Sequence, residues 1–276
     1  MSIVDHLSIS QVDTISKCGE MWRQRYVLKN IFKPGIAMLV GSATDESINE
    51  NLRHKVNNDG QLISIDDVSD IAAESFGRRV NFQGVSIFKE DGTLASQKGA
   101  GKDKAVRLAQ LHHEELAPVI TPKSVAHIQR RWRLGFDGID ADLVGVIDVQ
   151  EEIDENTDLI RDEKTTGKTP SADAGQISFQ LKTYALAVKV IDKKEARVQL
   201  DFMVDQKKGS RVEIREGGLI NDFTAVMLRF KMAYKAIAAG VFLPARPDDW
   251  WCSRKWCGYY GTTCPYTTQG KRRPTK

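Results

Sequence analysis

The stretch DLVGVIDVQEEIDENTDLIRDEKTTGK (residues 142–168) decides the fold of this chain. Two runs with alternating apolar side chains, 142–150 and 158–165, lie on either side of a turn-rich segment, which is the pattern of an antiparallel hairpin. A similar run at 125–136 precedes them. The sequence therefore predicts an antiparallel meander in the middle of the chain.

The hairpin carries charged side chains at spacings that suit a metal site. Side chains two apart share a strand face, so Asp162 and Lys164 point the same way and Glu163 points to the other side. Pairing of the strands brings Asp148 close to Asp162. Two carboxylates can bind Mg²⁺ for phosphate chemistry, and a lysine can orient the attacking water or stabilise the anion. Spacing alone fits a surface hairpin with a cross-strand ion pair equally well.

The end of the same stretch, Gly167-Lys168-Thr169, matches the end of a phosphate-binding loop. In the pattern G-x-x-x-x-G-K-[ST] the first glycine stands five positions before the second, where the backbone curls around phosphate. Asp162 occupies that position. A carboxylate there would repel phosphate and would lack the freedom of glycine, so the sequence argues against a nucleotide-binding loop.

Helical patterns surround the predicted meander. A helix is expected at 8–28, where Ser8 and Gln11 form a capping box, and another from about Ser42. Further helices are expected at 66–80, 101–117, 173–190 and 220–239, with a loop at 84–101 and a hairpin formed by ARVQLDFMV and RVEIRE. This order of elements predicts an α/β fold with a mixed central sheet flanked by helices.

The composition is that of an ordinary soluble protein. The chain of 276 residues is 41% hydrophobic and 28% charged, with a formal net charge of +3. It has no apolar run long enough to span a membrane and no signal peptide at its start, which indicates a cytosolic protein with no membrane association. The basic tail KRRPTK (271–276) is either a solvated end or a phosphate contact.

Four cysteines stand at the two ends of the chain: Cys18, Cys252, Cys257 and Cys264. A cytosolic protein is unlikely to hold them as disulfides, so four thiolates indicate one metal site. Such a site fits Zn²⁺ or an iron–sulfur cluster, and the spacing C-x₄-C-x₆-C leaves both open, as well as unligated buried thiols. The neighbouring Trp and Tyr side chains would shield the site from water.

Four blocks in one order resemble the RecB-type exonuclease branch of the PD-(D/E)XK nuclease superfamily, which includes CRISPR-associated and phage exonucleases with an iron–sulfur cluster. They are SISQVDTISKCGEMWRQRY (8–26), GVID with DEKTTGK (145–148 and 162–168), QLKTY (180–184) and the terminal cysteines. The resemblance implies a restriction-endonuclease-like core, with a helical N-terminal region and a C-terminal cysteine cluster. It also implies a 4Fe–4S cluster on the four cysteines, with zinc as the alternative.

The resemblance implies roles for individual residues. Asp148 and Asp162 would bind Mg²⁺ or Mn²⁺, with the backbone carbonyl of Glu163 as a further ligand, and Lys164 would be catalytic. The family often has a histidine ligand four residues after a glycine in an early helix, but GSATDESI places Asp45 there. Aspartate suits these hard cations at least as well. The alternative is that Asp45 caps a helix N-terminus.

Gln180 and Tyr184 are four residues apart and therefore share one helix face, which Gln176 extends. Such a polar stripe facing a sheet predicts that the pair positions a DNA strand or Lys164. A partly buried polar seam without a catalytic role is the alternative.

The residues and the resemblance together predict a metal-dependent DNA exonuclease. The resemblance implies that it acts on DNA with a free end, in recombination or end processing, with a recombinase or helicase as a candidate partner. It is expected to be one nuclease domain over 1–276, with a helical part at 8–120, a core at 125–240 and a cysteine-rich end at 241–276. If phage-encoded, it would work in the bacterial cytoplasm. The alternative is a non-catalytic nucleic-acid-binding module with a structural Cys₄ zinc site.

Overall fold

The computed structural model describes residues 4–87 and 92–268. The chain divides into two compact units. Unit 1 combines three segments from the two ends and the middle of the chain, and unit 2 combines the two segments between them. Unit 1 is Met1–Lys33, Arg133–Val144 and Thr224–Lys276, and unit 2 is Pro34–Trp132 and Gly145–Phe223. The basic tail lies outside the described residues.

The strands form a mixed sheet in the order β1-β3-β4-β5-β6, with β2 beside β3. The pairs β1/β3 and β4/β5 are parallel, whereas β3/β4 and β5/β6 are antiparallel. This confirms the predicted mixed sheet and both predicted hairpins. The strands are β1 (His6–Ser8), β2 (Ile128–Leu134), β3 (Asp142–Asp154), β4 (Thr157–Thr166), β5 (Glu195–Gln206) and β6 (Gly209–Leu219).

The β3/β4 hairpin brings Asp148 close to Asp162, as the sequence predicted. Val149 pairs with Arg161 at the end of the ladder, and the next residues along the two strands are Asp148 and Asp162. Gly145 is required on β3, because a Cβ there would come within 2.4 Å of the Trp132 indole. The glycine of the G-x-I-D block therefore makes room for a large aromatic ring on β2.

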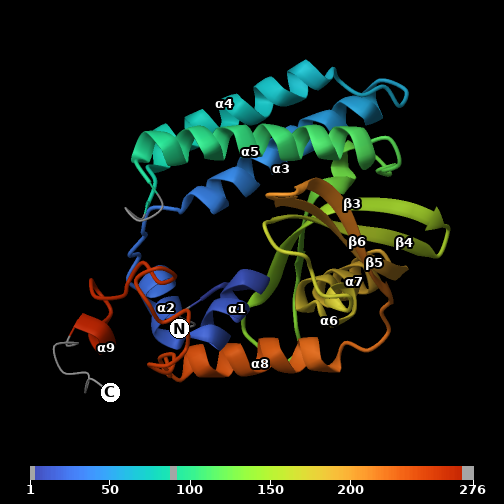
Figure 1. Cartoon of the computed structure of the whole chain (residues 1–276). Helices are drawn as coiled ribbons and strands as arrows, with labels where there is room; N and C mark the ends of the chain where they lie inside the picture. Colours follow the sequence, from blue (N-terminus) through green and yellow to red (C-terminus); the bar gives the residue numbers. More distant parts are fainter. Residues whose placement is uncertain (1–3, 88–91, 269–276) are drawn as a thin grey trace. The chain divides into compact units, whose positions relative to one another are not determined.

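Three long helices of unit 2 lie side by side: α3 (Ile36–Asn57), α4 (Ile65–Gln83) and α5 (Leu94–Glu115) (Figure 1). Their apolar faces form one buried cluster with residues of the sheet, including Val149 and Met203. Two predicted boundaries were wrong. Helix α3 begins six residues before Ser42, and α5 begins inside the expected loop, where the Thr93 side chain accepts from Ser96 N at 3.2 Å.

The other face of the sheet carries α6 (Ala174–Ile177) and α7 (Phe179–Ile191), which together replace the single helix expected at 173–190. Ser178 separates them and caps α7 by accepting from Leu181 N at 3.2 Å. The helix α7 packs against β4 and β5. Consecutive side chains of β4 therefore face different helices, α5 on one side and α7 on the other.

In unit 1 the helix expected at 8–28 is broken. Ser8 does cap the first helix, but the Gln11 side chain donates to His6 O rather than completing the capping box. The helix ends at Cys18, whose extended backbone also starts the next one. The elements are α1 (Ile9–Lys17), α2 (Gly19–Trp22), the π-helix η1 (Arg23–Val27), α8 (Thr224–Ala238) and α9 (Pro265–Thr268); the 3-10 turn η3 (Val125–His127) belongs to unit 2.

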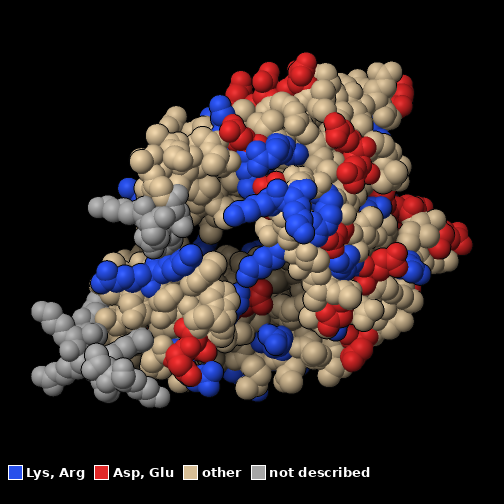
Figure 2. Space-filling model, in the orientation of Figure 1, with Lys and Arg blue, Asp and Glu red and all other residues tan. Residues whose placement is uncertain are grey.

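Positive charge gathers on unit 2. Figure 2 shows Lys and Arg side chains over α5 and β6 on the face drawn. The helix α5 contributes Lys98, Lys102, Lys104 and Arg107. Within the described ranges, no helix is both long and apolar enough to cross a membrane.

Candidate functional site

The acids of the hairpin lie together in unit 2, where Asp148 is partly exposed. Asp162 of β4 is fully buried, and Asp148 of β3 accepts from Glu163 N at 3.0 Å. Burial raises the pKa of Asp148 well above its usual value, and the neighbouring charge of Asp162 raises it further. Burial likewise raises the pKa of Asp162. Two like charges thus face each other with little solvent to screen them.

Lys164 shares the strand face of Asp162, as the alternation predicted, and its ammonium contacts the Asp162 carboxylate. Burial works against the charged ammonium, but Asp162, Asp148 and Asp45 together raise the pKa of Lys164 above its usual value. The lysine is therefore held in its charged form beside the acids.

Asp45 lies on α3 and reaches the group formed by Asp148, Asp162 and Lys164. It lies in the middle of that helix and not at its start, so it does not cap the N-terminus. The helix can approach β4 closely at Gly41, where a Cβ would lie only 3.2 Å from Thr165 Oγ1. One turn later, burial and the nearby Glu163 raise the pKa of Asp45 to about 6.

Gln129 of β2 joins the two acids and was not identified from the sequence. Its side-chain Nε2 donates to Asp45 Oδ1 at 3.3 Å and to Asp148 Oδ1 at 3.2 Å. The backbone of Gln129 has φ of 54°. No periodicity signals such a conformation inside a strand, so the sequence offered no indication of this contact.

His112 is a second residue that the sequence analysis missed. It is fully buried on α5, and its Nε2 lies 2.7 Å from Glu163 Oε1. His112 follows Ala105 and Leu108 by seven and four positions, so it continues their buried stripe. That spacing was a usable signal.

Gln180 and Tyr184 meet on α7 as predicted, with Gln180 Nε2 donating to the Tyr184 hydroxyl at 2.7 Å. Burial raises the pKa of Tyr184, and so do the negative charges of Asp162 and Asp148. The pair therefore lies on the α7 side of the acids, opposite the His112 contact.

A cavity of about 370 Å³ opens beside the acids and Lys164. Its lining includes Asp45, Asp148, Glu163 and Lys164. Among the residues that the structure describes, no three His, Cys, Asp or Glu side chains have the separations needed to hold a metal ion. The donor set still suits a divalent cation: three carboxylates converge here, and apart from the contact with Lys164 neither Asp162 oxygen has a hydrogen-bond partner among the described residues.

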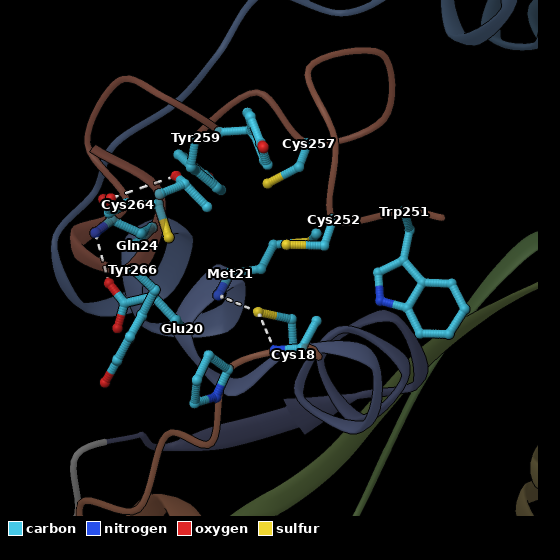
Figure 3. Close-up of a pocket in the computed structure, with 14 residues that line it drawn as sticks. Cys18, Glu20, Met21, Gln24, Trp251, Cys252, Cys257, Tyr259, Cys264 and Tyr266 are labelled. Carbon is cyan, nitrogen blue, oxygen red and sulfur yellow. Dashed lines mark hydrogen bonds between the residues drawn. The ribbon is translucent and has the colours of Figure 1, made fainter. Parts of the chain in front are cut away.

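The four cysteines gather around one hollow in unit 1, and their sulfur atoms point into it (Figure 3). None is in a disulfide. Cys18 Sγ accepts from Met21 N at 3.4 Å and from Ala245 N at 3.3 Å. Burial raises the pKa of Cys257, and the neighbouring thiols Cys18 and Cys264 raise it further. The structure thus brings together all four cysteines that the sequence grouped.

Tight turns of the last segment present three of these cysteines. Cys252 N donates to Asp249 O at 2.9 Å, Cys257 N to Ser253 O at 2.9 Å, and Cys264 N to Tyr259 O at 3.1 Å. Several aromatic rings line the hollow, whereas Trp250 and Trp256 are 64% and 57% exposed and pack on each other. The expected aromatic shield is therefore partial. Its lining members are Trp251, Tyr259, Tyr260 and Tyr266.

Comparison with solved structures finds a similar fold at low sequence identity. A crystal structure of a candidate exonuclease from Eubacterium rectale has a TM-score of 0.55 and 14% identity, covering 99% of this chain and 90% of that one. The crystal structure of SSO0001 has a TM-score of 0.35 and 11% identity, covering 92% of this chain and 95% of that one, and a score this low supports no argument. Among curated proteins, none matches.

The family comparison covers almost the whole sequence. The model of the PD-(D/E)XK nuclease superfamily matches residues 6–268, which include both hairpin acids, Lys164 and all four cysteines. The mixed sheet with helices on both faces agrees with that fold. The chain belongs to the PD-(D/E)XK nuclease superfamily.

Proposed function

We propose that this chain is a divalent-metal-dependent DNA exonuclease, acting at DNA ends in recombination or end processing. The carrying observation is the convergence of Asp148, Asp162 and Lys164 beside an open cavity in unit 2. A domain that only bound nucleic acid would have no need to bury two facing carboxylates against a lysine. The whole chain would act as one nuclease domain, because the family match runs through both units, and we propose that it acts in the cytosol.

Four groups would hold the cation, which is Mg²⁺ or Mn²⁺: the carboxylates of Asp45, Asp148 and Asp162 and the backbone carbonyl of Glu163. When bound, the cation lowers the pKa of water and offsets charge on phosphate oxygens. Lys164 orients the attacking water or stabilises the anion that develops on the phosphate. Partial burial weakens the screening of these charges by water.

Gln180 and Tyr184 would act from the α7 side of the site. The raised pKa of Tyr184 keeps its hydroxyl protonated at any physiological pH, so it remains a hydrogen-bond donor. We propose that the pair positions the DNA strand or Lys164. The basic side chains of α5 would contact the phosphate backbone, because phosphate charge dominates the affinity of nucleic-acid binding.

The four cysteines would hold a 4Fe–4S cluster, with zinc as the alternative. Four thiols around one hollow form a donor set that suits either. Two backbone N–H groups reach Cys18 Sγ and fix its orientation toward the hollow. The cluster would have a structural role, because the same unit contains both ends of the described chain.

The deciding experiment is digestion of end-labelled single- and double-stranded DNA with Mg²⁺, Mn²⁺ or EDTA. We expect cleavage that requires the cation and that is lost in Asp148→Asn and Asp162→Asn. Calorimetry should show weaker Mn²⁺ binding in both variants. Metal-independent binding of DNA without cleavage would favour the alternative, a nucleic-acid-binding module with a structural Cys₄ zinc site.

A further inference from the structure

Gln129 occupies a backbone conformation that its side chain does not favour. Its φ of 54° lies in the left-handed region, where glycine is free of strain and glutamine is not. Residues that keep such a conformation in spite of strain cluster at functional sites. The strained backbone of Gln129 therefore suggests that its side chain has a specific role.

The side chain of Gln129 bridges two acids from separate elements. One carboxamide nitrogen carries two hydrogens, and here it reaches Asp45 on α3 at 3.3 Å and Asp148 on β3 at 3.2 Å. The second oxygen of Asp148 accepts from Glu163 N at 3.0 Å. Asp148 is therefore fixed through both oxygens, and Asp45 is tied to it through one shared donor.

An amide suits this position better than a charged group. A lysine or arginine would neutralise the acids and compete with a cation, and an acid would add to their repulsion. A neutral donor fixes the orientation of both carboxylates while leaving their charge available.

We propose that Gln129 is a positioning residue that sets the orientation of Asp45 and Asp148 for cation binding and catalysis. This inference rests on the proposed function, because it assumes that both acids bind the cation. The strained backbone places the carboxamide between α3 and β3.

The test separates the side chain from the backbone. Gln129→Gly removes the carboxamide and relieves the strain, whereas Gln129→Asn tolerates the left-handed backbone but is one methylene too short to bridge both acids. Lys193→Gly is the matched control: Lys193 has φ of 60°, is exposed and lies outside the cavity lining. Each variant is measured for melting temperature in EDTA, Mn²⁺ affinity by calorimetry, and kcat and KM for DNA cleavage.

We expect Gln129→Gly and Lys193→Gly to melt at or above the wild-type temperature. Mn²⁺ affinity and kcat should fall by about tenfold or more in Gln129→Gly and Gln129→Asn, the usual effect of losing a hydrogen-bond partner of a metal ligand. The KM for DNA should stay within about twofold, since Gln129 acts through the acids. Lys193→Gly should match the wild type in Mn²⁺ affinity, kcat and KM.

Two results would overturn the inference. Gln129→Gly with wild-type Mn²⁺ affinity and kcat would show that the bridge is not needed, and a clear fall in its melting temperature would assign the side chain to the fold. A wild type that binds no Mn²⁺ would overturn it as well. A wild type that binds Mn²⁺ without cleaving DNA would instead refute the proposed nuclease function, and the Mn²⁺ affinity of the variants would still decide the role of Gln129.

Discussion

At the scale of single residues, Lys164 is the clearest test of the catalytic assignment. Its charge is maintained by the acids around it, so the ammonium is available to act on water or on the phosphate. We expect Lys164→Ala to lower DNA cleavage by about 10²- to 10³-fold, the range found when one group that stabilises a developing anion is removed. DNA affinity, measured by gel shift, should change little.

The control for this substitution is Lys208→Ala. Lys208 is an exposed lysine in the turn between β5 and β6, so its removal changes the net charge by the same amount. The Lys208→Ala variant should cleave DNA at the wild-type rate. Cleavage by Lys164→Ala close to that rate would refute the catalytic role of the lysine.

The pKa of Asp45 predicts how stability depends on pH. A carboxyl whose pKa is about 6 in the folded state, against a usual value of 3.8, binds more protons when folded than when unfolded between those values. The free energy of unfolding contributed by Asp45 therefore falls as pH rises through this window. In EDTA, we expect the melting temperature of Asp45→Asn to rise relative to that of the wild type between about pH 4 and pH 6, because the variant lacks this falling contribution.

Addition of Mn²⁺ at pH 7.5 extends the same test. The cation should raise the melting temperature of the wild type, because it binds the folded state, and should raise that of Asp45→Asn less. If Asp45→Asn has the pH profile of the wild type, Asp45 is not the titrating group.

At the scale of elements, the sequence predicted strands better than helix boundaries. The hairpin β3/β4 was identifiable because alternation and turn residues agree over a short distance, and the proximity of Asp148 and Asp162 followed from the pairing of its strands. The start of α3 was missed because Gly35, its N-cap, gives no side-chain hydrogen bond, while Ser42 resembles a cap. The break at Cys18 also escaped prediction, since the apolar spacing continues through it.

The contacts that complete the candidate site depend on tertiary structure. Asp148, Asp162 and Lys164 were predictable because they lie on one hairpin. Gln129 reaches the site through an irregular backbone, which no local propensity indicates. His112 was on a recognisable buried stripe, but its partner Glu163 lies 51 positions away in sequence, and that pairing could not be read from either segment.

The contact between His112 and Glu163 links α5 to the strand that carries the hairpin acid and lysine. Their side chains are 1% and 2% exposed, so His112→Ala leaves a carboxyl group buried without its partner. We expect a loss of about 1 to 3 kcal/mol in the free energy of unfolding, the cost of an unsatisfied buried polar group. Urea denaturation measures this loss.

The adjacent His113 provides a matched control for that substitution. It is partly exposed on the same helix and hydrogen-bonds to Asn51 at 3.1 Å. His113→Ala should lower stability clearly less than His112→Ala. Equal losses would show that the helix position, and not the contact with Glu163, sets the stability.

At the scale of the whole molecule, unit 1 joins the two ends of the sequence. Part of this joining needs no metal. The segment after α8 passes so close to α2 that a Cβ on Gly19 would lie 2.6 Å from Leu243 N, and Gly19 N donates to Leu243 O at 2.7 Å. Trp22 stacks on Phe242 with ring centroids 5.5 Å apart. A cluster held by the cysteines would add to an existing contact.

Cys18 is the residue that tests the cluster. A metal shared by Cys18, Cys252, Cys257 and Cys264 would close a loop of more than 200 residues. Closing so long a loop removes chain entropy from the unfolded state, by about 4 to 5 kcal/mol for a covalent crosslink and less for a metal bond. We therefore expect Cys18→Ser to melt at a lower temperature and to lose metal, although it lies in unit 1 and the candidate acids lie in unit 2.

The colour of the anaerobically purified protein distinguishes the possible metals. An iron–sulfur cluster should make the wild type brown, with broad absorption near about 400 nm, and Cys18→Ser should be pale. A colourless wild type with stoichiometric zinc would replace iron by zinc and keep the crosslink. Because the contacts at Gly19 and Trp22 remain in the variant, it should still fold at low temperature. Wild-type stability and metal content in Cys18→Ser would refute the crosslink, and the four thiols would then be an unligated part of the core of unit 1.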